Sequence, residues 1–328
     1  MEEGKIVSLR ITEVDLFYIS YDEPQKEEYW AKVQEIAPWA KRIDGVKGFD
    51  TAHKECARQS ETDRFITIDG DNIVYPEFFD LQIDIPEKLQ NKTLSWAGRN
   101  VINGLCYGNG GVKLWTKEFV LNMRTHENAT RDEEKVDFCW DNNYVQLNGI
   151  YSDTCPNGSP FQAFRAGFRE GVKMTLDRGA KAGEGKIDKY LHEKNYRRLL
   201  IWATIGADVE NGDWAIFGTR LGIFKANLEP TFDIAQISDY DWFKKYFDAD
   251  ISQRFIAGAD NKCPRTGVEW NSVDLRKYSA SFIPLLNRGL GMTIADMSPE
   301  QSAFFKSVYE PPKRTLNPLA TEIEVDRM

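Results

Sequence analysis

The chain has 328 residues, of which 41% are hydrophobic and 28% charged, and its formal net charge at pH 7 is −9. This length is enough for one large hydrophobic core or two unequal ones. The negative charge argues against broad, sequence-independent binding to nucleic acid. No apolar run approaches the ~18 residues that span a bilayer, so we expect a cytoplasmic protein with no membrane partner. The five cysteines lack Cys-x-x-Cys spacing, which argues against a zinc site.

The first third of the chain predicts alternating strands and helices. Hydrophobic patterns indicate strands at 13–21, 40–46 and 63–68, and helices at 25–38 and from about 50 to 60. The order strand, helix, strand, helix, strand is typical of an α/β unit with a parallel sheet. Ligands of such sheets bind at the carboxyl ends of the strands. The polar residues at these ends are therefore candidate ligand-binding residues: Ser20, Tyr21, Asp22, Lys47, Asp69 and Asp71.

Asp69-Gly70-Asp71 closes the third predicted strand. Two residues spaced i, i+2 on a strand point to the same face, roughly 6.5–7 Å apart. Carboxylates in that arrangement suit Mg²⁺ or Mn²⁺, which hold nucleotide diphosphates in many proteins. The motif thus predicts a metal-dependent nucleotide site. An ordinary strand-ending turn is the alternative, since Asp and Gly are frequent in turns.

Residues 48–71 resemble the GT-A glycosyltransferases, whose nucleotide-sugar half has a Gly, a helix and a strand that ends in Asp-x-Asp. The matching features are Gly48, the helix that carries His53, and the run from Phe65 to Asp71. The resemblance implies a GT-A, Rossmann-like core that takes a nucleotide sugar, most often a UDP-sugar. It implies that Asp69 faces the ribose or a metal-bound water and that Asp71 ligates the divalent metal, Mn²⁺ or Mg²⁺. His53 and Gly70 would belong to the same donor site.

Three later segments, 103–115, 157–173 and 202–208, resemble bacteriophage-type GT-A proteins. These are similar to the J-associated glucosyltransferase, which glycosylates hydroxymethylated thymine in DNA. The resemblance implies that the acceptor is a 5-hydroxymethylpyrimidine in phage DNA, modified in the cytoplasm of the host cell.

Candidate acceptor-binding residues lie in these segments. Backbone N–H groups of the glycine-rich run can approach a ligand closely, although a tight hairpin turn explains the glycines equally well. Arginines four residues apart on one helix face suit phosphate, although pairing with Asp153 or Glu170 is the alternative. An aromatic side chain could stack on a base. The candidates are Asn109, Gly110, Gly111, Trp115, Arg165 and Arg169.

The acidic stretch after residue 131 supplies a candidate general base. An inverting GT-A enzyme uses a carboxylate to take the proton of the acceptor hydroxyl. Asp137 is the first candidate because the apolar sequence around it would raise its pKa, and Asp141 and Asp208 are the other candidates. A solvated acidic helix is the alternative.

The sequence changes character near Leu228, where a helix with regularly spaced aromatic residues ends. We expect a GT-A core over 1–228 and a mostly helical extension over 229–328. Ser298, followed by Pro299 and Gln301, predicts a helix start with a capping box. A basic excess over 173–198 is a candidate DNA contact or a plain solvated surface.

Two other functions are compatible with the sequence. A GT-A enzyme could act on a polysaccharide, a lipid carrier or a protein, which the acidic composition favours. A non-catalytic nucleotide-binding phage protein, in which Asp-Gly-Asp is only a turn, belongs to a different class.

Overall fold

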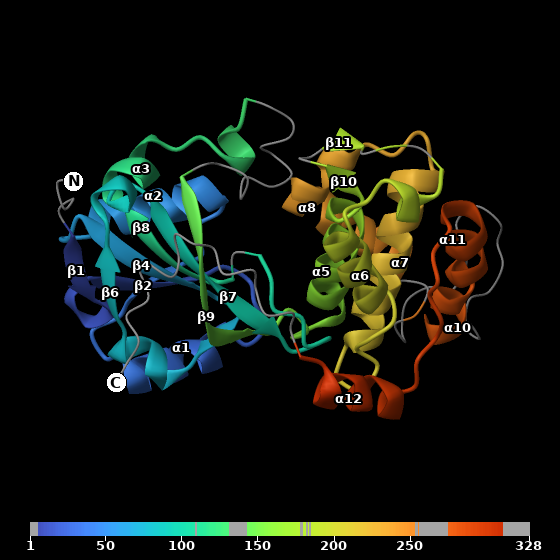
Figure 1. The fold of residues 1–328 in the computed structure, drawn as a ribbon, viewed down its shortest axis with the longest axis horizontal. Coiled ribbons are helices and arrows are strands. Elements are labelled where there is room, and N and C mark those ends of the chain that lie inside the picture. The colour runs from blue at the N-terminus through green and yellow to red at the C-terminus, as the bar shows by residue number, and fades with distance from the viewer. Residues whose placement is uncertain are drawn as a thin grey trace, which may run out of the picture. The chain divides into compact units, whose positions relative to one another are not determined.

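The computed structural model describes residues 6–108, 110–130, 143–177, 180–181, 183, 185–252, 255 and 275–310. The chain forms two compact units (Figure 1). The first comprises 1–134, 138–155 and 309–328, and the second comprises 135–137 and 156–308. The division therefore falls after Cys155, whereas we expected it near residue 228. Helix α7 (Gly212–Leu228) explains the difference, because it packs on α5 before it and on α10 and α11 after it.

The first unit is built on a seven-stranded mixed sheet in the order β3-β2-β4-β8-β7-β9-β5. Its strands are β2 Asp15–Ser20, β3 Lys41–Asp44, β4 Arg64–Asp69, β5 Asn72–Val74, β7 Thr93–Asn100, β8 Val112–Thr116 and β9 Tyr144–Thr154. Strand β2 pairs in parallel with both β3 and β4, while β8 runs antiparallel between β4 and β7. The α/β class predicted from the sequence is confirmed.

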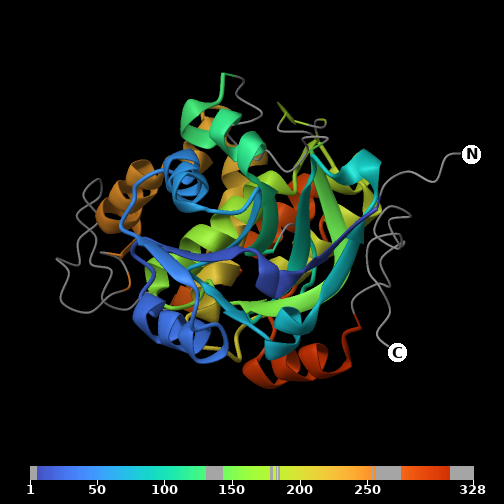
Figure 2. The same ribbon diagram turned by 90° about the vertical axis from the view of Figure 1, so that its left-hand side faces the viewer.

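Helices cover both faces of this sheet, because side chains alternate between the faces along each strand. Tyr18 of β2 and Ile66 of β4 pack on one face with Val33 of α1 (Lys26–Ile36). Phe17 and Phe65 pack on the other face with α2 (Phe49–Gln59) and α3 (Lys117–Asn122). Figure 2 shows α1 and α2, both blue, on opposite sides of the sheet.

Smaller elements complete the first unit. Strands β1 (Val7–Arg10) and β6 (Gln82–Ile85) form an antiparallel pair. The remaining described elements are short 3₁₀ helices: η1 Ile11–Glu13, η2 Pro76–Asp80, η3 Glu87–Leu89 and η4 His126–Asn128.

The second unit is mainly helical. Its α-helices are α5 Pro160–Lys173, α6 Glu193–Trp202, α7, α8 Tyr240–Tyr246, α10 Leu275–Ala280, α11 Phe282–Leu290 and α12 Pro299–Val308. Strands β10 (Leu176–Asp177) and β11 (Ala180–Lys181) form a small hairpin within the basic segment. The other elements are η5 Ile187–Lys189, η6 Ile234–Ser238 and the π-helix η7 Phe247–Ser252. None of the helices that the structure describes is both long and apolar enough to span a bilayer.

Glycines allow α5 and α7 to approach closely. A Cβ atom on Gly171 of α5 would fall on the Thr219 carbonyl oxygen, and one on Gly222 of α7 would fall on the Phe168 carbonyl oxygen. The two backbones are therefore in direct contact at these positions.

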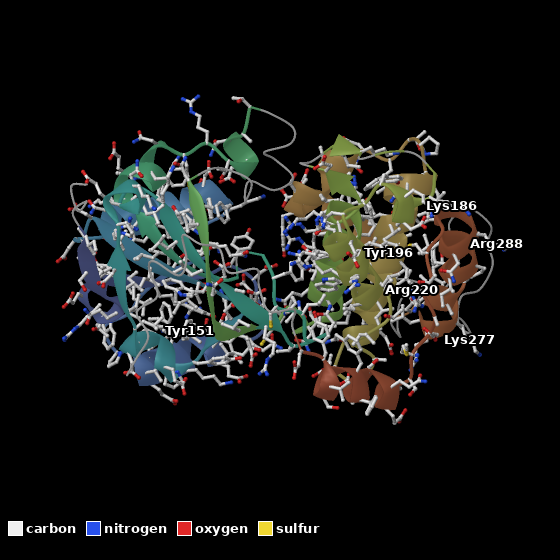
Figure 3. All side chains as sticks on the ribbon, viewed as in Figure 1. Tyr151, Lys186, Tyr196, Arg220, Lys277 and Arg288 are labelled. Carbon is white, nitrogen blue, oxygen red and sulfur yellow. The ribbon has the colours of Figure 1, made fainter. Side chains whose placement is uncertain are left out.

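Arg220 of α7 is completely buried within the second unit (Figure 3). It donates hydrogen bonds to the carbonyl oxygen of Ala203 at 2.8 Å, to Ser279 Oγ at 3.1 Å and to Asp296 Oδ1 at 3.0 Å. Helix α12 begins as predicted, since Ser298 Oγ accepts from the Gln301 N–H and Gln301 Oε1 accepts from the Ser298 N–H.

Candidate functional site

The Asp-Gly-Asp motif forms the turn between β4 and β5. Asp69 is the last residue of β4, Asp71 lies in the turn, and β5 begins at Asn72. The expected geometry of two carboxylates on one strand face is therefore wrong, because the strand ends before Asp71. The parallel pairing of β2 with β4 still places Asp69 beside Ile19, at the carboxyl end of β2.

A third carboxylate, that of Glu23, lies against this turn. Its Oε2 accepts a hydrogen bond from the Tyr21 N–H at 2.7 Å. A Cβ atom on Gly70 would lie 2.8 Å from Glu23 Oε2 and 2.9 Å from the Ile19 carbonyl oxygen. Glycine at this position thus lets the turn pack against Glu23. No local pattern predicts this contact, because it arises only when β2 and β4 pair.

The three carboxylates influence one another electrostatically. Burial, together with the nearby charges of Asp69 and Glu23, raises the pKa of Asp71 to about 7. Burial also raises the pKa of Glu23, with smaller contributions from Asp22 and Asp69. Mutual repulsion between carboxylates is relieved by a proton or by a cation.

Asn72 and β9 hold the turn in place. Asn72 Nδ2 donates to Asp71 Oδ1 at 2.9 Å, and Asn72 Oδ1 accepts from Ser152 Oγ and Thr154 Oγ1, both at 3.1 Å. The Cys155 N–H donates to the Asp71 carbonyl oxygen at 2.7 Å. The position of Asp71 is therefore fixed by the strand pair β5–β9.

The described glycines of the Gly-rich run are packed against protein. A Cβ atom on Gly111 would overlap the Asn72 side chain, and one on Gly110 would overlap the backbone of β7. The missing side chains of these two glycines therefore make room for protein atoms, and the approach of a ligand to their backbone N–H groups stays a prediction. The tight hairpin turn is wrong, since residues 101–111 separate β7 from β8. Asn109 lies outside the described residues.

Asp69 pairs with a buried lysine. Lys113 Nζ of β8 lies 3.3 Å from Asp69 Oδ2, and the lysine side chain is 8% exposed. His53 of α2 is also buried and contacts the carbonyl oxygen of Phe49 through Nδ1 at 2.8 Å. Burial lowers the pKa of His53 to about 4, so the ring is neutral at pH 7. Its Nε2 has no hydrogen-bond partner among the described residues.

Trp115 belongs to the core between the sheet and α2. It is fully buried, its Nε1 donates to Thr67 Oγ1 at 2.8 Å, and its ring centroid lies 5.0 Å from that of His53. The prediction that Trp115 stacks on an acceptor base is wrong, because the indole is fully buried. The strand pattern identified an aromatic residue but not the side of the sheet that α2 covers.

The other predicted donor residues lie at the ends of β2 and β3. Ser20 is buried and donates from Oγ to Asp44 Oδ1 at 2.7 Å. Lys26 Nζ lies 2.7 Å from the same Asp44 oxygen and donates to the Tyr21 carbonyl oxygen at 2.8 Å. Asp22 is exposed. Lys47 is also exposed and follows β3, the edge strand.

The remaining predicted residues fall in the second unit or outside the described residues. Arg165 lies over the rings of Tyr240 and Phe243, and Arg169 is half-buried on the same helix. Asp208 pairs with Lys306 at 2.7 Å. The other two candidate bases, Asp137 and Asp141, lie outside the described residues.

No model of a known protein family matches this chain, and no curated protein matches it. Within the described residues, no group of three or more His, Cys, Asp or Glu side chains is arranged to hold a metal ion. Two carboxylates, Asp69 and Asp71, remain as candidate ligands. This number suits Mg²⁺ or Mn²⁺ bound together with a diphosphate and water, since such ions commonly take one or two protein carboxylates.

Proposed function

We propose that the protein is a metal-dependent glycosyltransferase of the GT-A type, which transfers a sugar from a nucleotide-sugar donor to a hydroxyl group. One observation carries the proposal. The Asp69-Gly70-Asp71 turn gathers carboxylates at the carboxyl end of a parallel strand pair, and Gly48, α2 and β4 precede it in that order. The same order of glycine, helix, strand and Asp-x-Asp carries the resemblance in the sequence.

The chain's own residues would create the donor site. Asp69 and Asp71 would hold the divalent cation, and Glu23 would add negative charge next to them without being required as a ligand. A cation bound there would offset the charge that develops on the leaving nucleoside diphosphate. The raised pKa of Asp71 supports this proposal, because a carboxylate repelled by its neighbours gains from a nearby cation.

The donor half of the proposal can be tested by calorimetry. UDP should bind in the presence of Mn²⁺ and bind more weakly, through the protein groups alone, when EDTA is added. Asp71→Ala should abolish the metal-dependent part, because one hard oxygen ligand is removed. Asp80→Ala, which removes an exposed carboxylate of the same unit, is the matched control and should bind as the wild type does. UDP affinity that is equal with and without EDTA would contradict the metal site.

For the acceptor, we propose a 5-hydroxymethylpyrimidine of duplex DNA, and the resemblance to the bacteriophage-type proteins supports it. A base in a duplex has to be flipped out or reached in a groove. Asp137 is the proposed general base. Incubation with hydroxymethylated DNA and a panel of nucleotide sugars, followed by digestion and mass spectrometry of the nucleosides, tests this half. Unmodified DNA is the control.

The net charge of −9 favours a second acceptor class, a polysaccharide or other non-nucleic-acid hydroxyl. Donor hydrolysis without any transfer to hydroxymethylated DNA would support that class. Asp137→Asn should lower turnover by roughly 10²–10⁴-fold with donor affinity unchanged if Asp137 is the base. Near-normal turnover would move the role to another carboxylate.

A further inference from the structure

A row of polar side chains crosses the sheet next to Asp69. Thr67 of β4 pairs with Lys113 of β8, Lys113 pairs with Ser95 of β7, and Ser95 pairs with Gln146 of β9. Residues directly opposite one another on neighbouring strands share a face of the sheet. By the alternation along β4, this is also the face of Asp69. Four strands therefore contribute polar groups at the level just before the end of β4.

The neighbouring rows of the sheet are apolar. On the same face, the pair of Phe65 and Trp115 lies two residues before Thr67 along β4, and both side chains are fully buried against α2. The opposite face carries Leu94 and Leu114 in the other hydrophobic cluster. A lysine is thus buried at a position where the surrounding pattern of the sheet would accommodate an apolar residue.

Lys113 has little to compensate its charge. Within the described part of the chain, Asp69 Oδ2 is the acceptor that its ammonium group contacts. The distance of 3.3 Å is longer than the ~2.7–2.9 Å of a strong charge-assisted hydrogen bond. An ammonium group has three donors, and a buried charge is stable only when it is paired and hydrogen-bonded. The remaining donors suit an anionic ligand with several oxygen atoms.

We propose that Lys113 binds the diphosphate of the donor and that Asp69 holds its ammonium group in position. The inference rests on the proposed function, since the diphosphate is that of the nucleotide sugar. Under this proposal, Asp69 of the Asp-Gly-Asp motif has two roles: it would orient the ammonium group of Lys113, and it would face the divalent cation. It also assigns a binding role to β8, which lies beside β4 in the sheet but follows it by more than forty residues in the sequence.

The test compares binding of inorganic pyrophosphate, UDP and uridine by calorimetry, with Mn²⁺ and with EDTA. Lys113→Met keeps the length and apolar stem of the side chain and removes its charge. It should weaken pyrophosphate and UDP by roughly 10–100-fold in both conditions, the value of one or two hydrogen bonds to a charged group. Uridine affinity should not change. Lys117→Met is the matched control, because Lys117 donates to the Ser60 carbonyl oxygen at 2.6 Å beyond the other end of β8.

A second variant separates a binding role from a structural ion pair. Asp69→Asn should strengthen pyrophosphate binding in EDTA, because the ammonium is no longer shared with a carboxylate. If the stronger binding comes from the freed ammonium group of Lys113, it should disappear in the double variant Asp69→Asn, Lys113→Met. The double variant replaces the whole pair, so it should fold even if Lys113→Met alone leaves Asp69 unpaired and unfolds.

The outcomes distinguish the two proposals. Wild-type protein that binds neither UDP nor pyrophosphate in any condition overturns the proposed function together with the role of Lys113. Wild-type protein that binds both, while Lys113→Met binds them equally well, overturns only the role of Lys113. An Asp69→Asn gain that persists in the double variant would show that the carboxylate repels the anion directly, and it would also overturn the role of Lys113.

Discussion

Replacing Asp71 by Asn should stabilise the protein, and the gain should depend on pH. Folding raises the pKa of this carboxyl group from 3.8 to about 7 because of burial and the charges of Asp69 and Glu23. The folded state therefore holds the proton more tightly than the unfolded state does. By linkage, the free energy of unfolding of the wild type falls as pH rises from about 4 to about 7.

The size of the effect follows from the pKa difference. A change from 3.8 to about 7 corresponds to about 4 kcal/mol as an upper limit. Because the side chain is partly exposed, solvent screening reduces this value, and we expect roughly 1–2 kcal/mol. Asparagine has nearly the same shape and no charge, so Asp71→Asn should match the wild type below about pH 4 and exceed it by this amount above pH 7.

Urea titrations at pH 3.5, 4.5, 6, 7 and 8.5 measure the difference in the free energy of unfolding. Asp15→Asn is a control of opposite sign. Although burial acts the other way, hydrogen bonds from Lys41 and from the Glu61 N–H lower the pKa of Asp15. Its contribution is present above about pH 4 and is lost in stronger acid, so Asp15→Asn should be less stable than the wild type at pH 6 and above. An Asp71→Asn difference that stays constant from pH 4.5 to 8.5 would refute the reasoning.

Four further substitutions test the packing. Gly222→Ala should destabilise the protein by about 1–3 kcal/mol in urea titrations, because its Cβ would fall on a backbone oxygen of α5. Gly289→Ala should be neutral or slightly stabilising, since the nearest atom is a Leu228 methyl group at 3.3 Å and alanine favours helix. Arg220→Met should cost at least about 2 kcal/mol, because hydrogen bonds of a buried charge are lost. Trp115→Phe should lower stability by about 1–3 kcal/mol, because the hydrogen bond to Thr67 is lost, and should leave the affinity for hydroxymethylated DNA unchanged, whereas stacking of Trp115 on an acceptor base would lower that affinity.

Local patterns were sufficient for several elements of both units. The strand expected at 63–68 is β4, the helix expected at 25–38 is α1, and the capping box at Ser298 begins α12. Each of these depends on hydrophobic spacing or on a cap within a few residues. The division of the chain near residue 155 was not predicted, because the change in the hydrophobic pattern at Leu228 marks only the end of helix α7.

The candidate site was predicted only in part. Asp69 and Asp71 could be found because they are neighbours in the sequence. Glu23 and Lys113 could not, since their positions depend on how β2, β4 and β8 pair. The burial of Trp115 depends on which face α2 covers, and a strand of alternating residues does not say which of its two faces that is.

The hydrogen bonds of Arg220 connect parts of the second unit that are far apart in the sequence. Its guanidinium joins the end of α6 at Ala203, α10 at Ser279 and the segment before α12 at Asp296. If α10 alone detached, the guanidinium of Arg220 would lose its hydrogen bond to Ser279 and would stay partly buried without full compensation of its charge. We therefore expect residues 275–296 and α7 to open together as one cooperative unit, with backbone amides that exchange their hydrogens at a common rate.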